Sequence, residues 1–363
     1  MAGPTDTTWH IEPHTLAKHE ILRRYLAAWF PILASGHQRI VYLDGFCGPG
    51  RYAAGEPGSP IIALEEAKKH SAQLGDKQLT FLFLDEDNSR LIYLKEQLDQ
   101  IALPENFKVF VQQGEFEDEL RRLLERLDKS NRQMAPTFAF IDPFGFKDVP
   151  FEIVSRLLRN RSCEVLINFH IDKVNRFLEH PQEKIRQHIA DWLGITDVQF
   201  LAHLPGDRIG NLRMLYQKQL KTVARFVRFF EMRNDKNRPI YDLFFASNHP
   251  LGHIKMKEAF WRVDQESGYR FSDATNPDQL LLFENDPAPE LARLLQMQFG
   301  GEAIYSSEIK KWVNDETPFI GKHTTGALKY LESRGDISVE PIRRDGTKRR
   351  KNQYPGNALV RFK

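Results

Sequence analysis

Cysteine is almost absent from this chain of 363 residues, in which Cys47 and Cys163 carry the two thiols. Two cysteines cannot build a disulfide framework, and they supply too few ligands for a zinc or iron–sulfur centre. No run of residues approaches the roughly 18 apolar positions of a membrane helix. Residues 1–8 are polar and lack the apolar segment of a secretory signal. We therefore expect a cytoplasmic protein without a metal site and without membrane contact.

Charge of either sign is also nearly balanced, since the formal net charge is +2. The basic residues are nevertheless concentrated near the C-terminus, where residues 341–363 contain one acid, Asp345. A basic segment is typical of a surface that binds nucleic-acid phosphates, and also of a solvated tail. The candidate nucleic-acid-binding residues in this segment are Arg343, Arg344, Lys348, Arg349, Arg350 and Lys351.

A glycine-rich motif, Asp44-Gly45-Phe46-Cys47-Gly48-Pro49-Gly50, follows the short apolar segment 39–43. A strand that ends in an acid and opens into a glycine-rich turn is typical of the cofactor site of a doubly wound α/β fold. The third glycine of a dinucleotide fingerprint is missing, together with the helix that it should open. The motif favours S-adenosylmethionine, which has no pyrophosphate to place on a helix N-terminus. We therefore predict an α/β fold with a Rossmann-like, class I methyltransferase sheet.

Elements of alternating type follow this motif. Short apolar segments that indicate buried strands alternate with amphipathic helical segments, which predicts a parallel sheet with right-handed crossovers. A helix before the sheet contains Pro31, which we expect to bend or stop it. Apolar spacing such as Leu220, Val223 and Val227 predicts a helical insertion over about 170–238. The predicted strands are 39–43, 79–84, 107–112, 137–141, 164–169, 241–246 and the short 269–271.

Acids recur where the first two predicted strands end. In a methyltransferase sheet, the acid after the first strand contacts the methionine moiety, and an acid after the second accepts the ribose hydroxyls. Asp44 and Asp85 occupy these places, and we expect Asp85 to be an exposed strand-end acid. A helix cap or a solvated strand end would explain either acid alone, but their order after successive strands favours a site.

Further residues complete the predicted cofactor site. Gly48 and Gly50 allow the backbone to approach the cofactor closely, and the residues after the third strand are expected against adenine. Asn168, Lys18 and His19 are weaker candidates for the pocket, and His170 is expected at its rim or in the core. The predicted cofactor-binding residues are Asp44, Gly45, Phe46, Gly48, Gly50, Asp85, Glu86, Gly114, Glu115 and Phe116.

The tetrapeptide Asp142-Pro143-Phe144-Gly145 follows the predicted strand 137–141. An exocyclic amine becomes nucleophilic when a carboxylate and a backbone carbonyl accept its hydrogens, which suits Asp142 and the Pro143 carbonyl. Phe144 or Phe146 can then stack on a flipped-out base. A strand-to-loop turn with a capping aspartate is the alternative interpretation. The predicted catalytic residues are Asp142, Pro143 and Phe144.

The tetrapeptide resembles the Asp/Asn-Pro-Pro-aromatic motif of adenine and cytosine amino-methyltransferases, with Phe144 in place of the second proline. It is also similar to the tetrapeptide of tRNA guanine dimethyltransferases. The departure at Phe144 therefore does not exclude chemistry at an amine.

A second domain is expected after an Asn-, Asp- and Pro-rich linker. Three helices followed by two short strands around the basic loop predict a winged helix-turn-helix, with Lys322 on the recognition helix. The same layout also serves protein contacts. The predicted domains are 1–275 for the methyltransferase, 276–289 for the linker and 290–363 for the winged helix.

Over residues 14–270, the chain resembles the three-Cys-motif partner proteins. Members of that family are bacterial or phage-borne, are similar to methyltransferases, and are encoded beside a cysteine-motif protein of presumed radical chemistry. The resemblance therefore implies a three-Cys-motif protein as a partner, but it implies no substrate. It is carried by Leu26 and Trp29, 42–50, 58–60, 140–146 and 164–169.

Three hypotheses follow from these patterns. The first is a methyltransferase that uses S-adenosylmethionine on an exocyclic amine of a base in DNA or RNA. The second is a non-catalytic subunit that binds nucleic acid or nucleotide and positions the three-Cys-motif protein. The third is a transcription regulator that senses S-adenosylmethionine. Asp44, Asp85 and Asp142 together favour the first hypothesis, because a scaffold has no need of all three.

Overall fold

The computed structural model describes residues 6–146, 149–274, 286–340, 348 and 350–363. The chain divides into two compact units. The first unit takes in residues 1–259 and 270–276, and the second takes in residues 260–269 and 277–363. Residue 275 and most of the expected linker lie outside the described residues, so the expected domain boundary stays a prediction.

Within the described residues, an eight-stranded sheet forms the centre of the first unit, in the order β3-β2-β1-β4-β5-β7-β6-β8. Strands β1 to β5 are parallel to their neighbours, whereas β7 runs antiparallel to both β5 and β6. The strand order reverses between β1 and β4, which is where a doubly wound sheet opens a ligand site. This Rossmann-like methyltransferase arrangement confirms the predicted fold class. The strands are β1 (Arg39–Asp44), β2 (Gln78–Asp85), β3 (Phe107–Gln113), β4 (Thr137–Ile141), β5 (Cys163–Phe169), β6 (Phe226–Arg233), β7 (Pro239–Ser247) and β8 (Arg270–Ser272).

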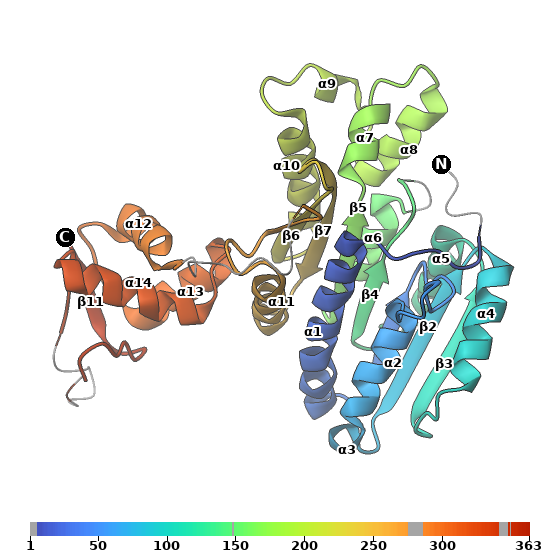
Figure 1. The fold of residues 1–363 in the computed structure, drawn as a ribbon, viewed down its shortest axis with the longest axis horizontal. Helices are drawn as coiled ribbons and strands as arrows, with labels where there is room; N and C mark the ends of the chain where they lie inside the picture. Colours follow the sequence, from blue (N-terminus) through green and yellow to red (C-terminus); the bar gives the residue numbers. More distant parts are fainter. Residues whose placement is uncertain (1–5, 147–148, 275–285, 341–347, 349) are drawn as a thin grey trace. The chain divides into compact units, whose positions relative to one another are not determined.

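Helices cover both faces of this sheet (Figure 1). α1 and α2 pack side by side and both contact β1, whereas α5 packs against α6, which lies on β5. α1 does not stop at Pro31 but continues to Gly36. Among the helices that the structure describes, none is long and apolar enough to cross a membrane. The helices are α1 (Pro13–Gly36), α2 (Ser59–Lys69), α3 (Ser71–Leu74), α4 (Asn88–Asp99), α5 (Phe116–Lys129), α6 (Phe151–Arg159), α7 (Ile171–Phe177), α8 (Glu183–Leu193), α9 (Gln199–Ala202), α10 (Arg208–Lys221) and α11 (Pro250–Val263).

The central strands are buried on both faces. All five residues of β4 are buried, and because successive strand side chains point to opposite faces, they supply two separate layers of core. On one face, Phe138 packs against Tyr25 of α1, with 5.0 Å between the ring centroids. On the other face, Ala139 and Ile141 belong to a cluster that includes Leu120 of α5. The near-continuous apolar sequence of these strands therefore gives both faces of the sheet a core, against which the two layers of helices pack.

The segment 170–238 is only partly helical. Helices α7 to α10 end at Lys221, and Phe226–Arg233 forms β6, so the expectation of an insertion without strands is wrong over its last part. A short apolar repeat fits a helix and a buried strand equally well, and here pairing with β7 decides for the strand. In Figure 1, α9 lies beyond the upper ends of β5 and β7, whereas α10 packs against β6 and β7.

The second unit is a winged helix-turn-helix. Helices α12, α13 and α14 pack around a core that includes Leu291, Ile309 and Leu328. A three-stranded sheet has the order β10-β11-β9. Strands β10 and β11 follow the helices, as the predicted layout requires, whereas β9 lies between α12 and α13 and was not predicted. Residues 341–347 and 349, within the expected wing, lie outside the described residues. The elements are α12 (Ala288–Phe299), β9 (Ala303–Tyr305), α13 (Ser306–Glu316), α14 (Gly321–Arg334), β10 (Ile337–Val339) and β11 (Leu359–Phe362).

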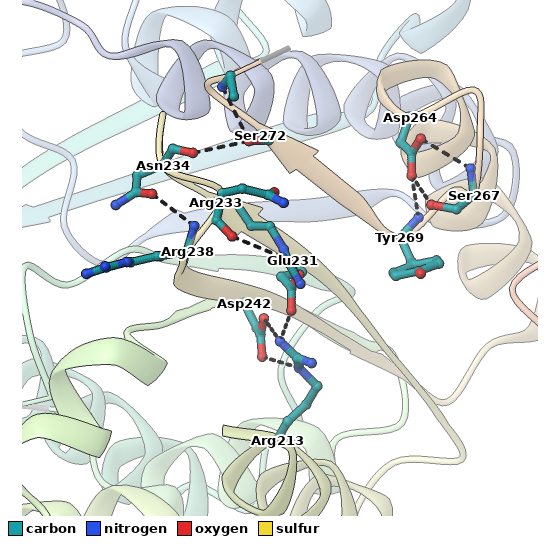
Figure 2. Close-up of polar contacts among 12 residues, drawn as sticks. Arg213, Glu231, Arg233, Asn234, Arg238, Asp242, Asp264, Ser267, Tyr269 and Ser272 are labelled. Carbon is teal, nitrogen blue, oxygen red and sulfur yellow. Dashed lines mark hydrogen bonds and ion pairs between the residues drawn. The ribbon is translucent and has the colours of Figure 1, made fainter. Parts of the chain in front are cut away.

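A cluster of buried charges joins α10 to strands β6 and β7 (Figure 2). The Arg213 guanidinium donates to both carboxylate oxygens of Asp242, at Nε–Oδ2 2.7 Å and Nη2–Oδ1 2.9 Å, and also donates to Glu231. Asp242 is fully buried, and this burial raises its pKa to about 6 despite the arginine. Arg233 contacts the other oxygen of Glu231. The two carboxylates therefore depend on Arg213 and Arg233 for charge compensation.

We expect Arg213→Met to lower the free energy of unfolding by about 3–5 kcal/mol, because it leaves Asp242 buried without its bidentate partner. Urea denaturation of the two proteins measures the difference. Arg156→Met is the matched control, since the Asp128 partner of Arg156 is exposed and such pairs contribute at most about 1 kcal/mol. Equal losses in the two variants would contradict the role given to the buried cluster.

Candidate active site

The loop after β1, residues 45–50, is called the glycine loop below. Gly48 and Gly50 have φ of +60° and +79°, a left-handed conformation that favours glycine. A Cβ atom on Gly50 would lie 2.5 Å from a methyl carbon of Leu94, so the backbone approaches α4 closely there. Both glycines are therefore required by local geometry, whatever the loop binds.

The glycine loop is tied to the strands on both sides of β1. The Gly45 amide donates to the Phe140 carbonyl of β4 at 2.9 Å, and the Cys47 amide donates to the Leu84 carbonyl of β2 at 2.8 Å. The Gly48 amide donates to Asp85 Oδ2 at 2.9 Å. These bonds fix the loop across the carboxyl ends of β1, β2 and β4.

Asp44 lies beneath this loop and is fully buried. Burial raises its pKa to about 7, against the lowering effect of bonds from Ser59 and the Phe46 amide. The Tyr42 hydroxyl also donates to it, at 3.3 Å. Asp44 lines neither of the two cavities described below. Its predicted contact with the methionine moiety stays a prediction, and its observed contacts are with the loop and its neighbours.

Asp85 is 4% exposed, so the expectation of an exposed acid is wrong. Besides the Gly48 amide, its carboxylate accepts the Asp87 amide at 2.9 Å, and Arg90 lies 3.8 Å away. Burial raises its pKa. The next residue, Glu86, has an exposed side chain that also lines the larger cavity, and within the described part of the chain no donor contacts its carboxylate. Glu86 is therefore the more accessible of the two acids.

The larger cavity has a volume of about 590 Å³ and lies at the carboxyl ends of β1 to β4. The rings of Phe46 and Phe116 stack in its wall, with centroids 5.4 Å apart. A Cβ atom on Gly45 would lie 2.4 Å from the Phe116 ring, so this wall exists because residue 45 has no side chain. Phe177 of α7 and Ile185 of α8 complete the lining. The predicted site residues that line it are Gly45, Phe46, Asp85, Glu86, Gly114, Glu115, Phe116, Pro143 and Phe144.

Asp142 follows β4 and is held by two donors of the chain. Lys18 Nζ lies 2.5 Å from Oδ2, and Asn168 Nδ2 donates to Oδ1 at 2.6 Å. Burial alone would raise the pKa of this carboxyl, but Lys18 and Asn168 hold it below its usual value. His170 Nε2 lies 2.7 Å from the Pro143 carbonyl oxygen, and Lys173 donates to the Phe144 carbonyl. The acceptors that the sequence assigns to a target amine therefore already have donors inside the chain.

A second, smaller cavity of about 310 Å³ lies beside the first, and Phe46, Pro143 and Phe144 line both. Gly48, Gly50 and Asp142 line this smaller cavity as well. The segment before α1 forms part of its wall through Trp9, whose ring lies 5.7 Å from Phe144 and 5.6 Å from Tyr52. The guanidinium of Arg90 lies 5.4 Å from the Trp9 ring and 5.3 Å from the Phe144 ring.

Several residues that line the smaller cavity could not be identified from sequence patterns. Trp9, Tyr52 and Tyr241 line the smaller cavity but lie outside any motif, because the fold brings them together from distant segments. Lys18, His19 and Asn168, weaker candidates in the sequence, also line it. His170 reaches the cavity rather than the core alone. Lys18, His19, Asn168 and His170 are polar residues within or beside apolar segments. That pattern is the signal in the sequence that would have favoured them as cavity residues.

The candidate nucleic-acid surface belongs to the second unit. Lys322 is exposed in the first turn of α14, the helix in the recognition position. Three residues of the basic segment, Lys348, Arg350 and Lys351, are also exposed. The other three candidates, Arg343, Arg344 and Arg349, lie outside the described residues.

Comparison with known proteins places a domain in the second unit. A family model described as a GMT-like wHTH domain matches residues 268–341. No curated protein matches the chain in sequence. A protein from Klebsiella pneumoniae assigned as an O-methyltransferase is 12% identical, with a TM-score of 0.31 over 66% of this chain and 92% of its own. One from Staphylococcus aureus assigned as a caffeoyl-CoA O-methyltransferase is 10% identical, with a TM-score of 0.27 over 58% and 75%. These low scores add nothing to the fold class, which rests on the strand order.

We expect Asp85→Asn to loosen the glycine loop. The Asp85 carboxylate accepts hydrogen bonds from the Gly48 and Asp87 amides, whereas the NH₂ group of asparagine would place a donor opposite one of them. The free energy of unfolding should fall by about 1–3 kcal/mol, and the Gly48 amide should exchange its hydrogen faster. Chemical denaturation and hydrogen exchange measure the two effects. Glu86→Gln is the neighbouring control and should change neither. An unchanged Gly48 exchange rate in Asp85→Asn would show that Asp85 does not anchor the loop.

Proposed function

We propose that the chain is an S-adenosylmethionine-dependent methyltransferase that acts on an exocyclic amine of a nucleic-acid base, together with a three-Cys-motif partner protein. The observation that carries the proposal is the larger cavity, which gathers residues that follow four successive strands of a methyltransferase sheet. Its volume of about 590 Å³ lies within the range of roughly 300–1,000 Å³ that is usual for small-molecule sites.

The lining of the two cavities fits the proposed cofactor. The stacked rings of Phe46 and Phe116 offer an apolar wall for adenine, and the Glu86 carboxylate offers an acceptor for ribose hydroxyls. The backbone of Gly48 and Gly50 offers a close approach for the methionine moiety. S-adenosylmethionine, when bound, supplies an electrophilic methyl group. Phe46, Pro143 and Phe144 line both cavities. The junction of the two cavities is therefore the place where the chain would bring the methyl donor and the target base together.

The winged helix and its exposed basic residues support a nucleic acid as the substrate. Lys322 lies on the helix that winged-helix proteins place in a groove, and Lys348, Arg350 and Lys351 lie on the expected wing. DNA and RNA both fit this surface. The support for a three-Cys-motif partner is the sequence resemblance over residues 14–270.

A non-catalytic subunit that binds nucleic acid or nucleotide is the second candidate. It is favoured by one observation: both oxygens of Asp142 and the Pro143 carbonyl already accept hydrogen bonds from the chain. A tetrapeptide that had lost its catalytic role would show this pattern. Cofactor binding distinguishes the two candidates, because a scaffold does not need S-adenosylmethionine.

We expect calorimetric titration to show micromolar binding of both S-adenosylmethionine and S-adenosylhomocysteine. Glu86→Gln should weaken both by about tenfold, because it removes a charged acceptor for the ribose hydroxyls. Glu96→Gln, an exposed acid on α4, is the matched control and should bind as the wild type does. If the wild type bound neither compound, the methyltransferase proposal would fail and the non-catalytic candidate would replace it.

We expect the triple variant Lys348→Glu, Arg350→Glu, Lys351→Glu to bind nucleic acid more weakly, because it replaces phosphate-binding cations by anions. On duplex DNA, the slope of log affinity against log salt should become shallower by about 0.9 for each phosphate that the variant no longer neutralises. Fluorescence anisotropy with a short DNA duplex and an RNA hairpin measures both effects.

The control for charge alone reverses three exposed lysines of the first unit, Lys129, Lys218 and Lys221. This control has the same net charge as the wing variant. Its slope of log affinity against log salt should nevertheless equal that of the wild type. Equal slopes in the wing variant and the wild type would mean that the wing does not contact phosphates.

A further inference from the structure

Residues that line the smaller cavity carry buried polar atoms that the chain leaves without a partner. Among the described residues, Asn168 Oδ1 and His170 Nδ1 are buried and accept or donate no hydrogen bond, and His19 Nδ1 is a third such atom. An unsatisfied buried polar atom costs about 1–3 kcal/mol, so its persistence in a cavity points to a ligand that satisfies it. The chemical state of each atom identifies the kind of ligand.

Asn168 presents an acceptor. Its Nδ2 atom lies 2.6 Å from Asp142 Oδ1. A carboxylate that remains charged can only accept hydrogen bonds, so the group facing it must be the NH₂ of the amide rather than its oxygen. The orientation of the amide is thereby fixed, and Oδ1 is left as a bare acceptor on a side chain that is 2% exposed.

His170 presents a second acceptor. Its Nε2 atom lies 2.7 Å from the Pro143 carbonyl oxygen, which can only accept, so Nε2 carries the hydrogen. Burial, together with nearby Lys173, lowers the pKa of this imidazole to about 3, so the ring is neutral at ordinary pH. In the neutral ring the other nitrogen has no hydrogen. Nδ1 is therefore also a bare acceptor.

The two acceptors belong to one edge of the site. Asn168 is the penultimate residue of β5, and His170 follows its last residue, so their side chains leave the same face of the chain. Both reach across to β4, Asn168 to Asp142 and His170 to Pro143. Strand β5 is the second neighbour of β1, about 10 Å away at the usual strand spacing. The acceptors therefore belong to a different strand from the glycine loop, where the methionine moiety is expected.

We propose that Asn168 Oδ1 and His170 Nδ1 recognise the two hydrogens of a primary amine on a planar ring, and thereby select an amino-bearing base over one with a carbonyl oxygen. The inference rests on the proposed function and names the group that the site admits. Two acceptors satisfy an NH₂ group, whereas a carbonyl oxygen would face them without any hydrogen. The aromatic side chains of Trp9, Tyr52 and Tyr241 line the same cavity and suit a ring.

The matched probes are cytidine and uridine, which differ by an amino group and a carbonyl oxygen at the same ring position. We expect the protein saturated with S-adenosylhomocysteine to bind cytidine at least tenfold more tightly than uridine in calorimetric titrations. His170→Gln should abolish this preference and keep wild-type affinity for S-adenosylhomocysteine. The glutamine can still donate to the Pro143 carbonyl but offers no acceptor at the Nδ1 position. Asn168→Leu is the second variant, and His203→Gln, at an exposed histidine, is the control.

Three results would overturn the inference: equal binding of cytidine and uridine, no binding of either nucleoside, or loss of S-adenosylhomocysteine binding in both variants. The last would assign the two acceptors to the cofactor. The same titrations without S-adenosylhomocysteine separate this inference from the proposed function. If the wild type bound no cofactor but preferred cytidine, and the variants lost that preference, recognition of the amine would stand and the methyltransferase proposal would fall.

Discussion

The left-handed turn of the glycine loop is the constraint on which the rest of the site depends. Gly48 and Gly50 can adopt this backbone, but a loop so shaped needs external bonds to stay in place. The strand ends on either side of β1 provide them, through the Leu84 and Phe140 carbonyls and the Asp85 carboxylate. The parallel sheet is therefore also the anchor of the loop, because it brings these acceptors to one edge.

Three aspartates lie at the ends of β1, β2 and β4, and they differ in their tendency to hold a charge because their neighbours differ. They are Asp44, Asp85 and Asp142. Burial raises the pKa of Asp44 to about 7, and it also raises that of Asp85. Asp142 is enclosed as well, yet Lys18 and Asn168 hold its pKa below the usual value. Of these three aspartates, Asp142, which follows β4 and lines the smaller cavity, therefore keeps its negative charge most firmly. The acid beneath the glycine loop can instead take up a proton near neutral pH.

Much of this fold could be predicted from the sequence, because buried parallel strands give apolar segments with acids and glycines at their ends. Strand β4 has the predicted bounds. The burial of Asp85 could not be predicted, since it results from the loop folding back over β2. Strand β6 was missed because its apolar spacing also fits a helix. Trp9 and Tyr241 have no local signature, because folding alone brings them beside Asp142.

The tetrapeptide after β4 gains a different physical role from these contacts. Asp142 and the Pro143 carbonyl already accept hydrogen bonds from the chain, so an incoming amine would have to share these acceptors. Each instead fixes a neighbour: the Asp142 carboxylate orients the amide of Asn168, and the Pro143 carbonyl fixes the tautomer of His170. The acceptors without a donor therefore lie at the end of β5, one strand away from the acceptors that the sequence predicts after β4. The charge of Asp142 would have to be desolvated by each incoming base, but Lys18 already compensates it. The acceptors proposed for the base are neutral and belong to residues that line the smaller cavity.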